Sequence, residues 1–374
     1  MRLSCCVVEN KMFQLVINKA FRRVVMFVVF VIGGIPTVFA GLSIAEAERL
    51  AIRDDYTLKS IGSRSESMSE LSVAAGGLPD PKLKLGFANL PTDSFRLGEE
   101  AMTQTVIGVR QEFPRGNTRE LKSARINESV ARNEAAAQDR KIQVLQAVRE
   151  DYTRVFLHRE RQKILEQSIV VFTDLAEITR DYYANGRAHQ QDVVQAQLEL
   201  SKVRERLTRI RQQEEQARAR LAERIGPDAY GDLEEHWPEF RQPSPSQATI
   251  DKLADHPRIR IWQHEIEKSR TSEEIARQAY KPGFAVDLAY GGRGGQNMDG
   301  SDRSDFLSVF VSMDIPLFTR NRQDRVLASS IAETSATQFT RDDIYRSMKA
   351  RVAEYSATLK HEQERLTLYS EYLL

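Results

Sequence analysis

The sequence predicts a mainly α fold with a small amount of β structure, built as a tandem repeat of a β-hairpin followed by a long antiparallel coiled-coil hairpin. The repeat is visible directly, because "PDPKLKLGFANLP" and "TVIGVRQEFPRGNTRELKSA" return as "YKPGFAVDLAYGG" and "SVFVSMDIPLFTRNRQDRVLAS". Pro81 pairs with Pro282 at an offset of 201 residues, and Pro114 pairs with Pro316 at an offset of 202. Long helical segments and short alternating strands predict the same architecture.

Residues 1–40 are predicted to be a cleaved secretory signal peptide. A basic segment precedes an apolar run over 24–35, and Val38 and Ala40 occupy the −3 and −1 positions of a cleavage site before Gly41. A single N-terminal anchor helix is the alternative, because this stretch approaches the length that spans a bilayer.

Both cysteines, Cys5 and Cys6, lie in this predicted leader, so we expect neither a disulfide nor a thiolate metal site in the mature chain. No cysteine follows the predicted cleavage point, so lipid attachment to a new N-terminal cysteine is not expected. Without residues 1–40 the chain has 49 basic and 52 acidic residues, because the leader holds five basic and one acidic of the 54 and 53 in the whole chain. That balance does not indicate nucleic acid as a partner.

Residues 116–226 are predicted to form a long helical hairpin. No proline or glycine occurs over Thr118–Asn185, and a helix of that span would be about 100 Å long at 1.5 Å per residue. Gly186 would end this helix, and a second helix would return as far as Ile225. The return helix carries a heptad seam of Val193, Ala196, Leu200, Val203, Leu207, Ile210, Glu214, Ala217 and Leu221. A predicted N-terminal helix over 41–78 is expected to cover the rest of the longer helix.

Two β-hairpins are predicted, over 79–115 and 282–318, with apolar and polar residues alternating along each strand. The apolar positions are Leu83, Leu85, Phe87, Ile107, Val109, Phe284, Val286, Leu288, Tyr290, Leu307, Val309, Val311, Met313 and Ile315. The alternation is typical of transmembrane strands and equally of a soluble sandwich. No second sheet is predicted to cover the apolar face, which favours a membrane barrel. Because small barrels need about eight strands, several chains would have to contribute, and the pattern does not choose between two and three.

The remaining segments complete the repeat. Residues 227–248 are rich in proline, glycine and acidic residues and are predicted to be a linker, and residues 249–281 are predicted to be the helix before the second hairpin. A second long helix is predicted over 319–374. The counterpart of Gly186 would fall near position 388 at the repeat offset, beyond Leu374, so we expect the second repeat to be incomplete. A non-functional truncated form is therefore one alternative.

The order of these elements resembles the TolC-like outer-membrane factors of Gram-negative efflux pumps over residues 42–374. The segments that carry the resemblance are "GLPDPKLKLGFANLP", "VRQEFPRGNTRELKSA", "YYANGRAHQQDVVQAQLEL", "HPRIRIWQHEIEKSR" and "DIPLFTRNRQ". The pair "LPDP" and "NLP" is most similar to the heavy-metal branch of that family.

The resemblance implies a homotrimer with a twelve-stranded barrel in the outer-membrane lipid and a hollow helical tunnel in the periplasm. Such a protein is a passive exit duct for small solutes, with metal cations as candidates. Its implied partners are a periplasmic adaptor (membrane fusion) protein and an inner-membrane efflux transporter. The resemblance also implies that the adaptor contacts a helical tip formed by Tyr183, Gly186, Arg187, Ala188 and Asp192.

The sequence predicts no enzyme, no cofactor and no metal site. Residues 291–305 lack the P-loop and EF-hand patterns, so we expect a mobile hairpin loop there. His256 and His264 do not have a common zinc spacing and are expected to have surface or helix-capping roles. A soluble periplasmic coiled-coil scaffold is the alternative from another class of function, but it would not explain the proline-bounded hairpins.

Overall fold

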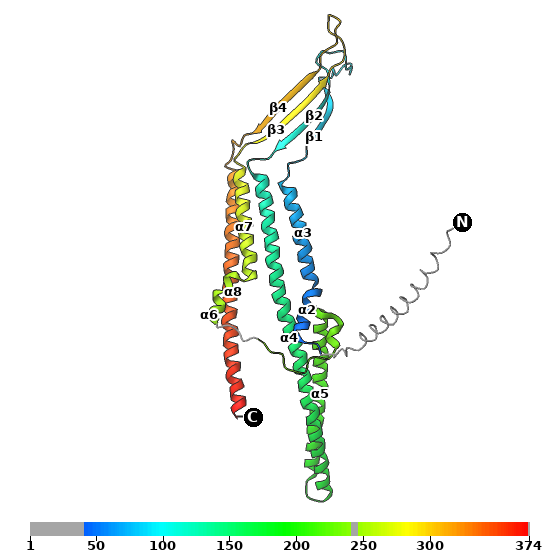
Figure 1. The fold of residues 1–374 in the computed structure, drawn as a ribbon, viewed down its shortest axis with the longest axis vertical. Helices are drawn as coiled ribbons and strands as arrows, with labels where there is room; N and C mark the ends of the chain where they lie inside the picture. The colour runs from blue at the N-terminus through cyan, green and yellow to red at the C-terminus, as the bar shows by residue number, and fades with distance from the viewer. Residues whose placement is uncertain (1–40, 241–245, 373–374) are drawn as a thin grey trace, which may run out of the picture.

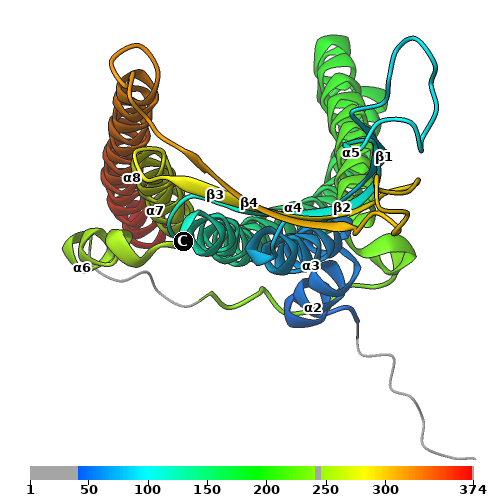
Figure 2. The ribbon, with the colours of Figure 1, turned by 90° about the horizontal axis from the view of Figure 1, so that it is seen from above.

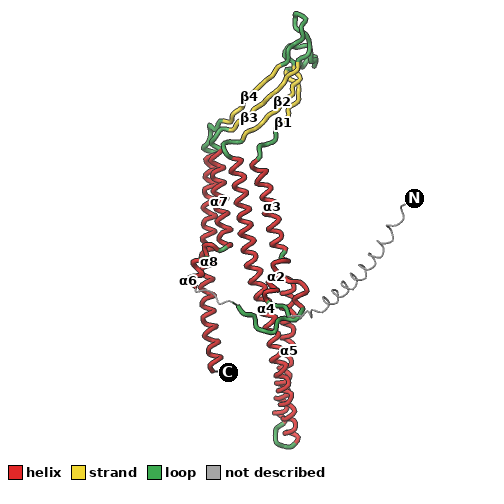
Figure 3. Tube along the Cα trace, viewed as in Figure 1, coloured by secondary structure: helices red, strands yellow, loops and turns green. Residues whose placement is uncertain are grey.

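The computed structural model describes residues 41–240 and 246–372, so the predicted signal peptide over 1–40 lies outside the described residues. The molecule is elongated, with a four-stranded sheet at one end and the tip of a helical hairpin at the other (Figure 1). Between them run long, nearly parallel helices, and Figure 3 separates the helical body from the strands at its end. The predicted mainly α fold with a small β part is confirmed.

The longest element is α4 (Thr118–Ala184), a helix of 67 residues. The helix α5 (Gln190–Ile225) packs back along its distal half. Most of the predicted heptad seam on α5 is buried, at Ala196, Leu200, Val203, Leu207, Ala217 and Leu221. Glu214, the polar member of the seam, is neutralised by Arg218, with 2.7 Å between its Oε1 and the arginine Nε. This pairing lets a carboxylate occupy a seam position.

The predicted N-terminal helix is interrupted and forms two helices, α2 (Ile44–Asp54) and α3 (Tyr56–Gly76). The break occurs at Asp55, whose backbone is extended and whose Oδ1 accepts a hydrogen bond from the Leu58 N–H at 2.6 Å. An aspartate at this position caps a new helix rather than continuing the old one. Both helices pack on α4, as the uncovered stripe of that long helix predicted.

The predicted helix over 249–281 is interrupted in the same way. It consists of α6 (Ser246–Asp251), the short 3₁₀ segment η2 (Leu253–Asp255) and α7 (Pro257–Gln278). His256 caps α7, because its Nδ1 accepts a hydrogen bond from the Arg258 N–H at 3.1 Å. The predicted capping role of this histidine is confirmed. His256 stands 201 residues after Asp55, so the two repeats break at equivalent positions.

The helices form a curved row when the molecule is seen from above (Figure 2). The helix α4 lies between α3 and α7, and α8 (Gln323–Tyr372) packs on the far side of α7. The helices α5 and α8 stand at the two ends of the row, while α2 and α6 lie on its outer, convex side. The chain therefore has the shape of a segment of a tubular wall.

The main core lies where α2, α4 and α5 meet the short helix η1 (Gly226–Tyr230). Its buried residues are Ala47, Leu50, Ala51, Val144, Val148, Tyr152, Val155, Phe156, Ala217, Leu221, Ile225, Ala229 and Leu233. The start of the predicted linker thus packs into the core instead of running free. Arg218 donates to the carbonyls of Ala229 (3.0 Å) and Gly231 (2.9 Å), and the first of these bonds satisfies a carbonyl of a buried residue.

The four strands are β1 (Lys82–Ala88), β2 (Gln104–Phe113), β3 (Gly283–Gly292) and β4 (Phe306–Asp314). They form one antiparallel sheet in the order β1-β2-β3-β4. The two hairpins, which belong to different repeats, are joined through β2 and β3, with Val109 opposite Leu288. This joint makes the two repeats one structural unit.

Candidate functional site

One face of the sheet is apolar and exposed; we call it the apolar sheet face. Strand register places on it Leu83, Leu85, Phe87, Ile107, Val109, Phe113, Phe284, Leu288, Tyr290, Leu307, Val309, Val311 and Met313. Each of these residues is 39% to 70% exposed. Within the part of the chain that the structure describes, no second sheet packs on this face. The arrangement differs from a soluble sandwich, in which two such faces would cover each other.

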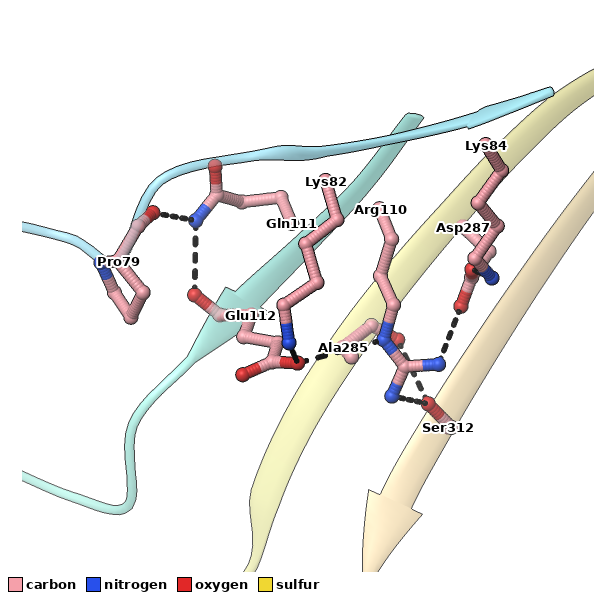
Figure 4. Close-up of polar contacts among 9 residues, drawn as sticks. All are labelled: Pro79, Lys82, Lys84, Arg110, Gln111, Glu112, Ala285, Asp287 and Ser312. Carbon is pink, nitrogen blue, oxygen red and sulfur yellow. Dashed lines mark hydrogen bonds and ion pairs between the residues drawn. The ribbon is translucent and has the colours of Figure 1, made fainter. Parts of the chain in front are cut away.

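The opposite side, the polar sheet face, carries Lys82, Lys84, Arg110, Glu112 and Asp287 (Figure 4). Lys82 Nζ lies 2.7 Å from Glu112 Oε1, and Arg110 Nη1 lies 3.2 Å from Asp287 Oδ2. Lys84 forms a second ion pair with Asp287. The carboxylate of Asp287, from the second repeat, therefore joins two cations of the first repeat across β1, β2 and β3.

The two outer strands of the sheet are open. In the described residues, β1 pairs only with β2 and β4 pairs only with β3. Each outer strand therefore has one side whose backbone N–H and C=O groups are available for pairing with another strand. These edges would be satisfied if further strands were added on both sides.

The predicted tip residues gather at the end of the α4–α5 hairpin, far from the sheet. Gly186 has φ +66°, and the N–H of Arg187 donates to the Tyr182 carbonyl at 2.7 Å. With the Gly186 N–H donating to Tyr183 O at 3.0 Å, these bonds form the left-handed cap that ends many helices. Tyr183 is 47% exposed.

The return helix starts directly after this turn. The Asp192 carboxylate accepts a hydrogen bond from the His189 N–H at 2.9 Å, which satisfies a backbone donor at the start of α5. Arg187 and Asp192 are exposed and Ala188 is half-buried. The structure thus brings all five predicted tip residues together on one turn, and their contact with an adaptor stays a prediction.

Residues 80–227 match the family model described as "Outer membrane efflux protein". This segment belongs to the outer membrane efflux protein family. It contains the first β-hairpin, α4 and α5, and so includes the predicted tip. Members of this family are passive channels rather than enzymes, as the sequence predicted.

Solved outer-membrane channels have the same fold as this chain. VceC from Vibrio cholerae aligns with a TM-score of 0.69 at 16% identity, over 88% of this chain and 81% of its own. CusC aligns with a TM-score of 0.71 at 16% identity, over 91% and 81%. The channel CmeC of Campylobacter jejuni aligns with a TM-score of 0.64 at 13% identity, over 87% and 75%. A comparison with curated protein sequences found no match.

Sequence reasoning missed a row of exposed apolar residues on the same helical hairpin; we call it the tip stripe. It comprises Ile164, Val171, Leu175, Ile178 and Tyr182 on α4. The α4 members could have been found, because Ile164, Val171 and Ile178 repeat every seven residues. Their exposure marks a second apolar face of this chain, on α4 near the tip.

Two other features singled out in the sequence have structural roles. His264 Nδ1 lies 2.9 Å from Glu128 Oε2 and links α7 to α4. In the loop between β3 and β4, Arg303 Nη1 donates to the carbonyls of Gly98 (3.3 Å) and Glu100 (3.0 Å) in the other hairpin loop. Over residues 41–240 and 246–372, there is no cluster of three or more metal-binding side chains. In the same ranges, no helix is both long and apolar enough to cross a membrane.

Proposed function

We propose that this chain is the outer-membrane exit duct of a tripartite efflux system and that it conducts small solutes from a periplasm-spanning pump to the exterior. The observation that carries this proposal is the exposed apolar sheet face, whose residues are 39% to 70% accessible. Monomeric soluble proteins rarely expose apolar patches larger than a few hundred Å². Lipid hydrocarbon is the occupant that fits a sheet with one apolar and one polar face.

Several copies must combine to make a closed duct. Four strands cannot close a barrel, since small barrels need about eight, and the edges of β1 and β4 are free to pair with other copies. We infer a homotrimer, in which three sheets supply a twelve-stranded barrel in the outer membrane. The curved row of helices supports this arrangement, because rows from three copies would enclose a tunnel continuous with the barrel.

The exposed tip of the α4–α5 hairpin supports a proposal about the partners. We propose that a periplasmic adaptor contacts the tip residues Tyr183, Gly186, Arg187, Ala188 and Asp192, and that the tip stripe lies against neighbouring helices of the assembly. An inner-membrane transporter would supply the energy, since the duct itself is passive. The resemblance to the heavy-metal branch makes metal cations one candidate class of solute.

Fractionation of cells that express the full chain, including residues 1–40, tests the proposal. We expect the protein in the outer-membrane fraction as an oligomer that resists mild detergent, with the mass of three chains. A soluble periplasmic monomer would instead favour the coiled-coil scaffold. Rapid degradation in the periplasm would also count against the duct.

A further inference from the structure

The two lysines on the polar sheet face are more exposed than the carboxylates that neutralise them, whereas Arg110 is more exposed than Asp287 but less exposed than its second partner, Glu112. The Lys84 side chain is 52% exposed, whereas that of its partner Asp287 is 12% exposed. Lys82 is 64% exposed and its partner Glu112 is 40% exposed. Arg110, at 33%, also covers Asp287. The ammonium and guanidinium groups therefore lie between solvent and the Asp287 carboxylate.

This arrangement gives the middle of the polar sheet face a positive surface. Lys82, Lys84 and Arg110 contribute three positive charges, while Glu112 and Asp287 contribute two negative ones. A narrow passage with low-dielectric walls focuses such a field onto passing ions. Three copies around one passage would multiply the excess.

The positive surface ends where the sheet meets the helices. There Arg115 pairs with Asp314 at 3.2 Å, and the order of exposure reverses, since Arg115 is 28% exposed and Asp314 is 71% exposed. The excess of exposed positive charge is thus confined to the strands that carry Lys82, Lys84 and Arg110. A solute leaving the helical part would meet this region next.

We propose that the polar sheet face makes the duct favour small anionic solutes over cations, which counts against free metal cations as its solute, and that Asp287 is the residue that limits this preference. The proposal rests on the proposed function, because it requires this face to line the passage. Asp287 forms ion pairs with both Lys84 and Arg110. Removing its negative charge therefore leaves two cations without that partner at once. Lys84 acts in the opposite sense, because its loss exposes the carboxylate beneath it.

Reversal potentials in planar bilayers test this inference. Purified oligomers of the full chain would be inserted into a planar bilayer that separates two KCl solutions of unequal concentration. The sign and size of the reversal potential then give the ratio of chloride to potassium permeability. We expect Asp287→Asn to raise that ratio by about twofold or more, and Lys84→Gln to lower it by a similar factor. Both effects should shrink as salt increases, because salt screens the field.

Matched controls come from α2, on the outer side of the helical row. Arg53 and Asp54 form an exposed ion pair at 2.7 Å, so Arg53→Gln and Asp54→Asn change the same charges away from the sheet. Both controls should leave the permeability ratio unchanged. If the Asp287 variant does not assemble, Lys84→Gln alone tests the inference. It replaces a side chain that is 52% exposed, so it should not disturb folding.

The outcomes separate this inference from the proposed function. Pores that conduct with an unchanged ratio in both sheet variants would overturn the inference and leave the duct standing. A change in the wrong direction, or an equal change in the α2 controls, would also overturn it. An unmodified protein that forms no conducting pores would overturn the proposed function and this inference with it.

Discussion

Arg140, in the first half of α4, forms an ion pair with Asp55, the residue at which the N-terminal helix breaks. The guanidinium Nη2 lies 2.7 Å from Asp55 Oδ2, while Asp55 Oδ1 accepts the Leu58 N–H at 2.6 Å. One oxygen of the carboxylate therefore caps α3 and the other ties it to α4. The equivalent residue of the second repeat, His256, caps α7 beside the same part of α4.

Substitution of Asp55 should loosen the start of α3. Asp55→Ala removes the cap and the ion pair, and we expect a loss of about 1–2 kcal/mol in the local stability of that helix. Asp55→Asn keeps a capping oxygen and should cost less. Hydrogen exchange of the amides over 56–60 measures the difference, and equal protection in both variants and the unmodified protein would contradict the assigned role.

The ionisation of Asp55 should make the stability of the start of α3 depend on pH. Burial disfavours the charged carboxyl of Asp55, but the hydrogen bonds from Arg140 and the Leu58 N–H outweigh burial, so the pKa of Asp55 lies below its usual value. A lowered folded-state pKa means that the stabilisation is present above the pKa of the unfolded chain and is lost as pH falls through the folded-state pKa. Exchange at the start of α3, compared with Asp55→Asn at each pH, should rise only in that acidic range.

His256 should make the start of α7 sensitive to milder acid. Burial lowers the pKa of its imidazole below 6.5, assisted by Arg258 and opposed by Asp139. The neutral ring accepts the Arg258 N–H, so protonation removes the cap, and stability present above pH 6.5 is lost as pH falls below it. His256→Asn, which caps without titrating, should abolish the dependence. Identical pH profiles of α7 exchange in the two proteins would rule this out.

Gly186 should be required for the shape of the tip. Its φ of +66° disfavours any residue with a side chain, although a Cβ there would meet no atom within 4 Å. Gly186→Ala should therefore cost about 1–2 kcal/mol in local stability and weaken adaptor binding, with Gly186→Asn less harmful. Gly62→Ala in α3 is the control, since that position is helical and equally open. Full adaptor binding by Gly186→Ala would remove the tip from the proposed interface.

A charge on the apolar sheet face should prevent stable insertion into the membrane. Leu85 is 69% exposed in the middle of β1, and an arginine at the bilayer midplane costs about 2–4 kcal/mol. Three copies would carry this cost three times, so Leu85→Arg should greatly reduce the outer-membrane oligomer. Tyr56→Arg, at an 82% exposed position on α3, should not. An undiminished oligomer of the Leu85 variant would place that face away from lipid.

Local sequence patterns predicted much of the candidate site. The features that they did not predict have identifiable physical causes. The left-handed turn at Gly186 was predictable because the conformation of one residue decides it. The break at Asp55 was missed, although aspartate is a good cap, because apolar residues occur on both sides of it. The capping role of His256 was predicted, but the interruption of the helix over 249–281 was not. The packing of Ala229 and Leu233 was missed because a segment rich in proline and glycine reads as a linker whether or not side chains such as Arg218 bind its carbonyls.

The sequence by itself determined the helical hairpin, the alternation of each strand and the turn at the tip, since each depends on residues close together in the chain. Only the tertiary structure decided that β2 pairs with β3. That pairing brings Asp287 to Lys84, 203 residues away, and to Arg110, 177 residues away. Such contacts depend on strand register and on how the two repeats meet, and no local pattern encodes either. The charge of the polar sheet face is therefore a property of the folded chain.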